Sequence, residues 1–399
     1  MKKKLLFIMP SLTSGGGERS LVTLLNKIDF DLYSVDLFLL MHEGLFVEFV
    51  PKEVRIIPLP DTYHMFSLPL LQSLWKLVSK GNGKLAYNRL MFTFRNRNLK
   101  NVALREQYNW KYISKSLENI KGNYDVAIGF LEKTATYICV DKVDSAARKI
   151  GWVHIDYDQL GMDPVFDQAY FDKLDQIVTV SQECATVLES RFPEQKEKVN
   201  VIYNIVSPTF INSMADQHHE ELFEKEENQI VILSIGRLHY QKNFVIAIES
   251  CKKLIDRGYN ISWNIIGDGE ERERLLALIK EYNLENHFKL LGLKSNPYPY
   301  IKQADIYSQT SRFEGKSIAI DEAKILNKPI IVTNFSTAKD QITHGIDGMI
   351  VEMNSDAIAD EIEKMIINAE LRTKLTTNLA SLQLGTEDEI NKFYELINR

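Results

Sequence analysis

The sequence predicts an α/β protein with two doubly wound domains, each a parallel sheet covered by helices on both faces. Short apolar runs rich in β-branched residues alternate with longer amphipathic segments, the pattern of buried parallel strands and their crossover helices. The length of 399 residues exceeds what one hydrophobic core normally serves. A polar, acidic stretch at 207–228 separates two halves of similar pattern, so we expect the interdomain linker there.

The expected strands and helices follow the hydrophobic pattern. In the first half, apolar runs predict strands at Leu5–Met9, Val35–Leu40, Val54–Ile57, Asp125–Phe130, Lys149–Val153, Gln176–Val180 and Asn200–Ile202. The second half predicts strands at Ile230–Ile235, Ile261–Ile266, Phe288–Leu291, Asp305–Ser308, Pro329–Val332 and Met349–Val351. Apolar residues at three- and four-residue spacing predict helices at 242–257, 270–282, 317–326 and 355–368. The domains are therefore expected at 1–206 and 229–383, with 384–399 forming a final helix that packs back toward the first domain.

Composition and charge narrow the class of protein. The chain is 45% hydrophobic and 26% charged, which is ordinary for a globular protein. Its net charge of −6 does not support a general nucleic-acid binder, so no nucleic-acid partner is expected. The three cysteines (Cys139, Cys184 and Cys251) lack CxxC spacing and are expected to be buried and reduced. No apolar run approaches the roughly 20 residues of a membrane span, and the expected location is cytoplasmic.

One part of the first domain interrupts the alternation of strands and helices, and we expect a basic helical insertion at about 68–121. From Leu71 to Lys121 there are eleven Lys or Arg residues against only Glu106 and Glu118, with large aromatic and Met side chains such as Trp75, Phe94 and Trp110 interleaved. This composition suits in-plane contact with an anionic membrane, at the inner face of the plasma membrane. The alternative is an elaborated insertion whose aromatics are core and whose lysines are solvated.

The loop after the first strand is rich in glycine. Ligands of open α/β sheets bind at the carboxyl ends of the strands, which makes such loops the places to search. Gly15, Gly16 and Gly17 open a helix whose free N–H groups could meet a phosphate or a polar acceptor. The loop has neither P-loop nor dinucleotide spacing, and a plain tight turn explains it equally well.

A basic loop in the second half carries a stronger signal. The strand ending at Ile235 leads into Gly236 and Arg237, with Lys242 five residues further on at the start of a helix. Arginine offers a planar fork to phosphate oxygens, lysine offers a mobile point charge, and the helix start adds positive potential. Together they suit a diphosphate.

Two more loops lie at the same predicted edge. One, with Gly267 and Gly269, combines a tight turn with an acidic helix start. The other contains Glu314 and leads into a helix that contains Glu322, so that the first carboxylate precedes the helix and the second lies about two turns into it. Two such carboxylates can accept hydrogen bonds from hydroxyl groups at two separate points of an elongated ligand.

Taken together, these motifs resemble the family 4 glycosyltransferases, retaining enzymes of the GT-B fold with two Rossmann-like domains facing each other across a cleft. The resemblance rests on the following segments: Gly15–Arg19, Val180–Ser181, Val201–Asn204, Gly236–Arg237 with Lys242, Gly267–Glu270, and Phe313–Gly315 through Glu322–Ala323. The last is the family's glutamate, seven residues, glutamate motif.

The resemblance also implies residue roles. Arg237 and Lys242 would hold the donor diphosphate and stabilise the leaving group, Glu314 would contact the sugar hydroxyls, and His154 would face the sugar. The implied donor-binding residues are Gly236, Gly267, Gly269, Gly315, Lys316, Ser317 and Glu322. Gly15, Gly16 and Gly17 would form the acceptor or phosphate loop.

The implied reaction is retaining transfer of a hexose or N-acetylhexosamine from a nucleotide sugar, with UDP favoured over GDP. The acceptor would be a saccharide or lipid-linked hydroxyl in bacterial surface polysaccharide or glycolipid biosynthesis. No cofactor is expected. No metal is expected either, because the basic clamp can replace its charge and the Asp-x-Asp pairs at Asp29 and Asp156 are misplaced. A nucleotide-sugar epimerase and a non-catalytic binding subunit are the alternatives. The segment 335–341 lacks the family's paired-glycine turn, which leaves donor identity open.

Overall fold

The computed structural model describes residues 2–13, 15–217, 222–223 and 228–399, which form two compact units. The first unit comprises the chain up to Thr13, Gly17–Ile202 and Lys392–Arg399, and the main part of the second is Tyr203–Asn391. Each unit contains one sheet in which every pair of neighbouring strands is parallel.

The first unit has a seven-stranded sheet in the order β3-β2-β1-β4-β5-β6-β7. Its strands are β1 (Lys3–Met9), β2 (Tyr33–Leu39), β3 (Arg55–Ile57), β4 (Tyr124–Gly129), β5 (Ala146–Val153), β6 (Gln176–Thr179) and β7 (Val199–Val201). The chain winds outward from β1 in one direction, then returns to place β4 on its other side. Phe7 of β1 pairs with Leu37 on one side and Ile128 on the other.

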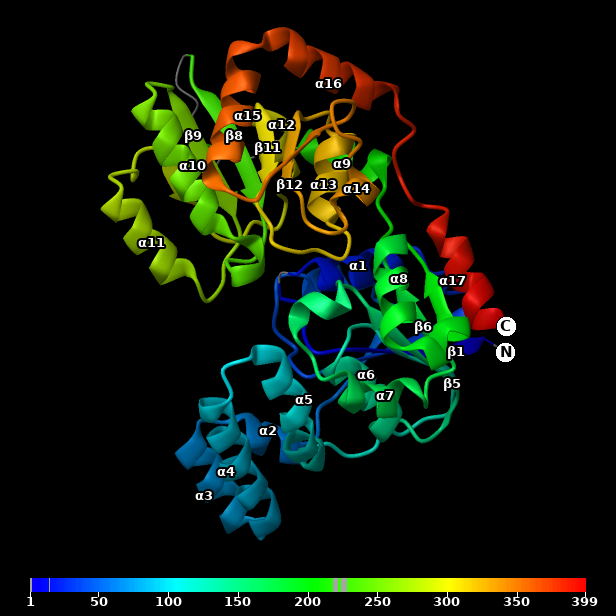
Figure 1. The fold of residues 1–399 in the computed structure, drawn as a ribbon. Helices are drawn as coiled ribbons and strands as arrows, with labels where there is room; N and C mark the ends of the chain where they lie inside the picture. The colour runs from blue at the N-terminus through cyan, green and yellow to red at the C-terminus, as the bar shows by residue number, and fades with distance from the viewer. Residues whose placement is uncertain (1, 14, 218–221, 224–227) are drawn as a thin grey trace. The chain divides into compact units, whose positions relative to one another are not determined.

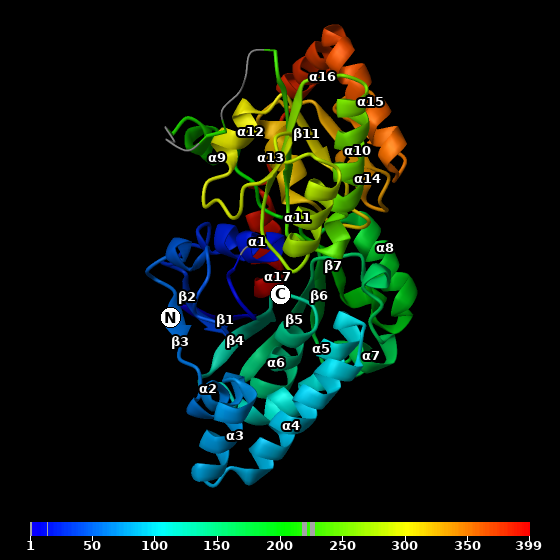
Figure 2. The same cartoon turned by 90° about the vertical axis from the view of Figure 1, so that its left-hand side faces the viewer.

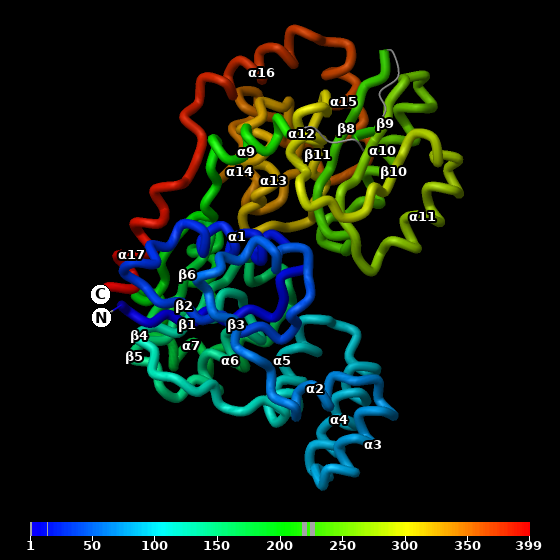
Figure 3. Tube along the Cα trace, turned by 180° about the vertical axis from the view of Figure 1, so that it is seen from behind, coloured from blue at the N-terminus to red at the C-terminus, as the bar shows by residue number. Residues whose placement is uncertain are grey.

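Helices cover both faces of this sheet. They are α1 (Gly16–Leu25), α2 (Asp61–Ser67), α3 (Leu70–Ser79), α4 (Gly83–Asn98), α5 (Val102–Ile113), α6 (Thr134–Lys142), α7 (Pro164–Phe171) and α8 (Gln182–Arg191). Short 3-10 helices lie at Val47–Phe49, Ser114–Ser116, Tyr157–Leu160 and Pro193–Lys198. Helices α2–α5 fill the connection between β3 and β4, and Figure 3 shows α3 and α4 side by side there.

The last helix, α17 (Glu389–Asn398), packs its final residues on the first unit. Phe393 is fully buried with its ring 6.0 Å from that of Phe7. Lys3 Nζ donates to Ile397 O at 2.6 Å and Arg148 donates to Leu396 O at 3.0 Å. These side chains satisfy carbonyl groups that a helix end leaves without partners. The two chain termini consequently lie close together in this unit (Figure 1).

The second unit has a six-stranded sheet in the order β10-β9-β8-β11-β12-β13. Its strands are β8 (Ile230–Ile235), β9 (Ile261–Ile266), β10 (Phe288–Leu290), β11 (Ile306–Gln309), β12 (Ile330–Thr333) and β13 (Met349–Val351). Its helices are α9 (Pro208–Ala215), α10 (Phe244–Asp256), α11 (Arg272–Glu281), α12 (Tyr298–Gln303), α13 (Ile318–Ile325), α14 (Ala338–Gln341), α15 (Ser355–Ile367) and α16 (Ala369–Ser381). The predicted strands all recur in the structure within a few residues of their expected bounds, as the continuous apolar runs indicated.

Alternate residues of each buried strand serve opposite faces of this sheet. In β8, Ile232 joins the core under α10, α11, α15 and α16, whereas Val231 and Leu233 join the core under α9, α12, α13 and α14. Figure 2 shows α9, α12 and α13 on one side of β11 and α10 and α15 on the other. This two-sided burial explains why the strand is apolar at consecutive positions.

The expected linker at 207–228 differs from the structure in its first part. Residues 208–215 form α9, whose Ile211 and Ala215 are buried in the core of the second unit. Ser207 caps this helix and Pro208 occupies its first turn, and both are strong helix-start signals that the acidic composition obscured. Residues 218–221 and 224–227 of the expected linker lie outside the described residues. Within the described ranges, no helix combines the length and apolarity needed to cross a bilayer.

Candidate functional site

The strand order places a topological switch point in each sheet. In the second unit the chain leaves β8 and β11, which are neighbours, in opposite directions around the sheet. Ligands of doubly wound sheets bind outside the carboxyl ends of the strands at such a point. The loops there are 236–243 after β8 and 310–317 after β11. These are the two loops that the sequence singles out for their basic and acidic residues.

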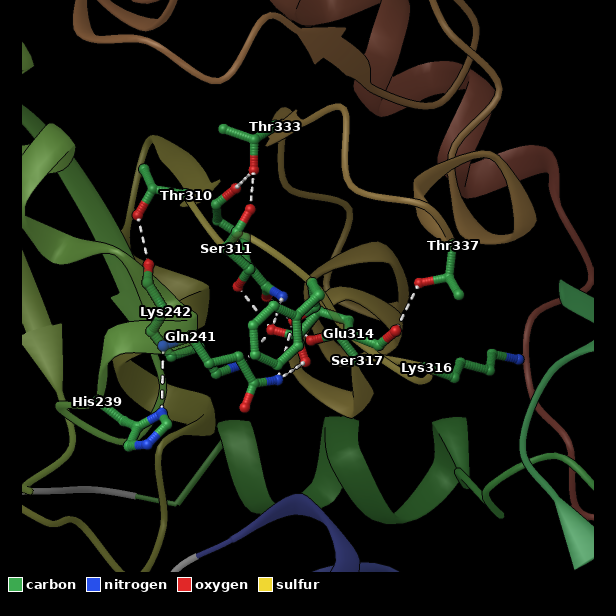
Figure 4. A network of polar contacts seen from close by, with 12 residues as sticks. His239, Gln241, Lys242, Thr310, Ser311, Glu314, Lys316, Ser317, Thr333 and Thr337 are labelled. Atoms are coloured by element: carbon green, nitrogen blue, oxygen red, sulfur yellow. Dashed lines mark hydrogen bonds and ion pairs between the residues drawn. The ribbon is translucent and has the colours of Figure 1, made fainter. Parts of the chain in front are cut away.

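Glu314 is the centre of a polar network that joins the two loops (Figure 4). Its side chain is buried, with 8% exposed. Its Oε1 accepts from Lys242 Nζ at 2.7 Å, from Ser311 Oγ at 2.6 Å and from Gln309 Nε2 at 3.0 Å. Its Oε2 accepts from Gln241 Nε2 at 3.2 Å. The carboxylate is thus compensated by one cation and three neutral donors, as a buried charge requires.

Further hydrogen bonds hold the two loops in register. Thr310 Oγ1 donates to Lys242 O at 2.9 Å, and Arg312 N donates to Gln241 O at 2.7 Å. The Arg312 guanidinium also lies 4.3 Å from the centroid of the Tyr240 ring. These contacts fix the backbone from which Lys242 extends, so its ammonium is positioned before any ligand binds.

Arg237 is the accessible cation of the first loop. Its side chain is 63% exposed and lies 3.5 Å from Glu270, to which His239 Nε2 also approaches at 3.3 Å. An exposed pair at this distance is weak and can exchange for a stronger anion. The structure therefore brings Lys242 to Glu314 and leaves the Arg237 fork available to a phosphate group.

Three glycines in this site have neighbours so close that an added Cβ would clash with them. At Gly267, which has a φ of +150°, an added Cβ would lie 1.9 Å from Gly236 O. At Gly236, a Cβ would lie 2.7 Å from Lys242 Cε. Gly269 is equally crowded, because its Cβ would be 2.4 Å from Leu238 O. Glycine at these positions lets the turns after β8 and β9 touch and leaves room for the lysine side chain.

Glu322 lies in helix α13, where it is the fifth residue and therefore just over one turn from the helix start. It is only 1% exposed, and its Oε1 accepts from Tyr298 OH at 3.1 Å. The sequence placed it about two turns into the helix, which is slightly too deep. The glutamate pair nevertheless has the expected arrangement, with one member in the loop and one on the helix.

Ser317 and Lys316, the other expected residues beside Gly315, point in different directions. Ser317 Oγ donates to Gln309 Oε1 at 2.9 Å and so joins the network around Glu314. Lys316 points away from Glu314 in Figure 4; its ammonium lies 3.7 Å from Asp321 and 4.1 Å from the Tyr203 ring centroid. The sequence could not reveal this direction, because both partners come from other elements.

Gln341 is a residue of this region that the sequence reasoning did not identify. It lies in the segment 335–341, which departs from the family pattern. Its Oε1 accepts from Ser317 N and its Nε2 donates to Ser317 O, both at 2.8 Å. It also donates to Asp321 Oδ1 at 3.1 Å, and burial raises the pKa of the Asp321 carboxyl. An anion at the start of α13 must therefore use amides other than that of Ser317.

In the first unit, His154 and Gly17 meet at the carboxyl ends of the central strands. His154 follows β5, and its ring lies 5.0 Å from Phe130 and 6.0 Å from Trp152, measured between ring centroids. A Cβ on Gly17 would lie 3.7 Å from His154 Cγ and 3.1 Å from Leu131. Gly16 opens α1 and Gly15 precedes it, and space around Gly16 is open. Ser14 lies outside the described residues.

The His154 ring is held neutral. Burial lowers its pKa to about 3, and a hydrogen bond to the Phe130 backbone opposes this only in part. Its Nε2 is shielded from solvent and has no hydrogen-bond partner among the described residues. A neutral imidazole can donate or accept one hydrogen bond at this atom when a ligand reaches it.

The turn between β4 and α6 supplies a buried carboxylate that the sequence did not indicate. Glu132 is 8% exposed, and its Oε2 accepts from His154 N at 3.1 Å. Burial raises the pKa of its carboxyl, against the opposing charge of Lys133. Lys133 has a φ of 63° and a ψ of −118°, a strained conformation for a residue with a side chain, and its ammonium lies 2.7 Å from Glu106. A lone glutamate after a strand has no motif that could have identified it.

In each Asp-x-Asp pair, the first aspartate accepts a hydrogen bond from the backbone of the second. Asp29 Oδ1 accepts from Asp31 N at 2.9 Å, and Asp156 Oδ1 accepts from Asp158 N at 3.2 Å. Asp158 in turn lies 2.9 Å from Arg191. The three cysteines are buried free thiols, as their spacing predicts.

Comparisons with known proteins agree with this geometry. Residues 216–381 match the family model described as glycosyl transferases group 1. An uncharacterised glycosyltransferase of Methanocaldococcus jannaschii is 31% identical over 43% of this chain and 43% of its own length. The amylovoran biosynthesis glycosyltransferase AmsD of Erwinia amylovora is 27% identical over 56% of this chain and 62% of its own. The matches thus span about half the length of these relatives, and the second unit is similar to group 1 glycosyl transferases.

Solved structures resemble the chain over its whole length. HepE of Anabaena, in complex with UDP and glucose, superposes with a TM-score of 0.69 at 17% identity and covers 99% of both chains. Staphylococcus aureus TarM gives a TM-score of 0.67 at 14% identity and covers 100% of this chain and 99% of its own. With the two parallel sheets, these likenesses confirm the expected GT-B fold class.

Removal of the Lys242 ammonium should destabilise the second unit. Lys242→Met leaves the buried Glu314 without its cation, and we expect a loss of about 3 kcal/mol in the free energy of unfolding. The double variant Lys242→Met/Glu314→Gln removes both charges and should recover most of this loss. Chemical denaturation of the three proteins measures both effects, and equal stability of the single and double variants would contradict the interpretation.

His154 should stay neutral throughout the physiological range. Because its folded pKa is near 3, its Cε1 proton resonance should not shift between about pH 8 and pH 5, whereas an ordinary histidine titrates near 6.5. Stability contributed by the neutral ring is fully present above pH 6.5 and declines as the pH falls toward 3, since only the unfolded chain takes up the proton. Histidine-labelled protein and His154→Gln identify the resonance, and a titration midpoint near 6.5 would exclude the buried state.

Proposed function

We propose that the chain is a retaining, family 4 type glycosyltransferase whose second unit binds a nucleoside-diphosphate sugar. The observation that carries the proposal is the Lys242–Glu314 pair, buried at the β8/β11 switch point beside the exposed Arg237. Cations for a diphosphate and a carboxylate for hydroxyl groups lie together there, at the edge where doubly wound sheets take their ligands. The similarity of residues 216–381 to group 1 glycosyl transferases supports the same conclusion.

The two cations would act on the leaving diphosphate. Departure of the diphosphate from the sugar concentrates negative charge on the leaving oxygens, and preplaced donors stabilise that charge most effectively. Lys242 has three N–H donors and directs one of them to Glu314, so it can also contact a phosphate oxygen. Arg237 would exchange Glu270 for the second phosphate. Lys242 and Arg237 would together supply the positive charge that a metal ion supplies in metal-dependent enzymes, so no metal is included in the proposal.

The two glutamates would recognise the hydroxyl groups of the donor. Glu314 Oε1 accepts three bonds, whereas its Oε2 accepts one, which leaves Oε2 the capacity to accept from a sugar hydroxyl. Glu322, oriented by Tyr298, would accept from the ribose. We propose UDP as the nucleotide, because HepE and TarM structures contain UDP. A hexose or N-acetylhexosamine is the proposed sugar.

The acceptor would bind to the first unit. Among the relatives, a Campylobacter jejuni protein, 28% identical over 55% of this chain, is named as an N-acetylgalactosaminyltransferase acting on a diphospho-undecaprenol saccharide. We therefore propose a saccharide on a lipid carrier as acceptor, in bacterial polysaccharide or glycolipid synthesis. The protein groups available to an acceptor hydroxyl are the neutral His154 ring and the buried Glu132 carboxylate beside it.

Arg237→Ala should strongly lower transferase activity while leaving the fold intact. The guanidinium is exposed, so its loss should not change the melting temperature, but it should lower kcat by about 100-fold if it stabilises the leaving group. Transfer from UDP-sugars to a lipid-linked saccharide extract measures the rate, and NMR of the product tests retention of the anomeric configuration. Chelation of metal ions should leave the rate unchanged.

Arg274→Ala provides the matched control for this prediction. Arg274 is 66% exposed and lies 2.8 Å from Glu271, so it resembles Arg237 in exposure and pairing but lies on α11. It should behave as wild type. Equal rates for the two variants would refute the proposed role, and formation of an epimerised nucleotide sugar without acceptor would point to an epimerase instead.

Glu132→Gln should separate acceptor use from donor binding. The amide keeps an oxygen that can accept from His154 N but removes the carboxylate charge, so we expect a rise in the acceptor KM or a fall in kcat of at least about tenfold. The UDP dissociation constant, measured by calorimetry, should remain that of wild type, since Glu132 lies in the first unit. Asp141→Asn is the control, because Asp141 also accepts side-chain hydrogen bonds in this unit. A weakened UDP affinity in Glu132→Gln would contradict the assignment.

A further inference from the structure

The helical insertion of the first unit exposes large apolar side chains in two ordered stripes. On α3 they are Leu71, Trp75 and Val78, with 81%, 72% and 61% of their surfaces exposed. On α4 they are Tyr87, Leu90 and Phe94, with 62%, 46% and 64% exposed. Spacings of three and four residues place each trio on one side of its helix. We call these six residues the α3–α4 apolar stripes.

The stripes are not part of the insertion's own core. That core is formed by other side chains of α2, α3 and α4: Met65, Phe66, Leu77, Leu85 and Ala86. Six of the eighteen exposed large hydrophobic residues among the described residues fall in this stretch of 24 positions. Scattered single hydrophobics are normal on a protein surface, but ordered rows of them mark a contact surface.

Basic residues are interspersed with the stripes along the sequence, and acidic residues are absent there. Between residues 62 and 105 there are eight Lys or Arg residues and no Asp or Glu. Exposed Lys76, Lys80, Lys84 and Arg97 form no ion pair with any described residue. Arg89, by contrast, is bonded to Thr93 and Leu68 O and lies over the Phe66 ring. The insertion therefore offers unpaired cations beside exposed apolar groups.

From this arrangement we propose that α3 and α4 seat on an anionic lipid bilayer, with the α3–α4 apolar stripes entering the interface and the neighbouring cations contacting lipid phosphates. Amphipathic helices with aromatic and basic residues bind membranes in this in-plane manner. A second copy of the chain fits less well, because the unpaired cations of two copies would face each other. The binding is independent of the donor site and goes beyond the proposed transferase reaction.

Trp75 makes the contact directly observable. The other three tryptophans (Trp110, Trp152 and Trp263) are at most 3% exposed, so a change of tryptophan environment on a membrane reports Trp75. Vesicles containing phosphatidylglycerol should shift the emission to shorter wavelength, and phosphatidylcholine vesicles should not. The shift should vanish in Trp75→Phe, which should still float with anionic vesicles. Flotation with an unshifted wild-type emission would overturn the proposal.

Two pairs of substitutions test the apolar and the electrostatic contributions to membrane binding separately. We expect Trp75→Ser/Phe94→Ser and Lys80→Glu/Lys84→Glu each to lower the fraction bound in flotation at least tenfold. The matched controls are Ile367→Ser/Leu382→Ser, exposed on the second unit, and Lys52→Glu/Lys374→Glu, exposed and unpaired among the described residues. Raising the salt from about 0.05 M to about 0.5 M should release the wild-type protein, because the charges are screened.

Three results would overturn the proposal. They are binding that ignores lipid charge and salt, equal loss in the test and control variants, and absence of binding together with a dimer in sedimentation that Trp75→Ser/Phe94→Ser abolishes. The last would identify a second copy as the occupant. All measurements use the full chain without nucleotide sugar, so failure of the transferase proposal would leave them unaffected.

Discussion

The ion pair between Lys242 and Glu314 is the interaction on which the candidate site of the second unit depends. It joins the loops that follow two neighbouring strands, β8 and β11, whose sequence positions are about seventy residues apart. Buried carboxylates are tolerated only when compensated, and here the cation and three neutral donors all come from these loops and the end of β11. The same contacts that satisfy the buried charge therefore fix the position of the lysine ammonium. In the proposed function, stability and recognition would share one set of side chains, arranged before a ligand arrives.

The sheet topology explains why a comparable arrangement recurs in the first unit. In both sheets the fourth strand of the unit returns beside the first, as β4 beside β1 and β11 beside β8. The loop after that fourth strand carries a buried glutamate in each case, Glu132 in one and Glu314 in the other. Helices from the two neighbouring strands cover opposite faces of the sheet, so their starts diverge and leave the strand ends open to a ligand. The chemistry differs, because Glu132 bonds a backbone amide and Glu314 bonds a lysine.

The hydrophobic pattern was sufficient to predict the strands, and motif spacing was sufficient to predict the Arg237, Lys242 and Glu314 loops. Buried parallel strands are apolar at every position, and this signal is local. The directions and partners of individual side chains are not visible in these patterns. The direction of Lys316 is set by Asp321 and by Tyr203, and the importance of Gln341 arises only when it meets the start of α13. Helix α9 falls within the expected linker because acidic residues follow it closely, although its capping residues are visible in the sequence.

The helical insertion of the first unit shows that composition alone does not tell which aromatic side chains are buried and which are exposed. An aromatic, basic segment is compatible with a packed helical core or with a membrane surface, and the structure divides the aromatics between the two. Trp110 is buried, whereas Trp75 is exposed. The distribution of charge would then decide which side of the protein faces an anionic bilayer. The net charge of −6 is the sum of +8 in residues 62–105 and −14 in the rest of the chain. An anionic bilayer would attract the insertion and repel the remainder, so electrostatics alone would turn the α3–α4 apolar stripes toward the lipid before any apolar contact forms. Attraction at long range and burial at short range would thus select the same face, which a scattered distribution of the same lysines could not achieve.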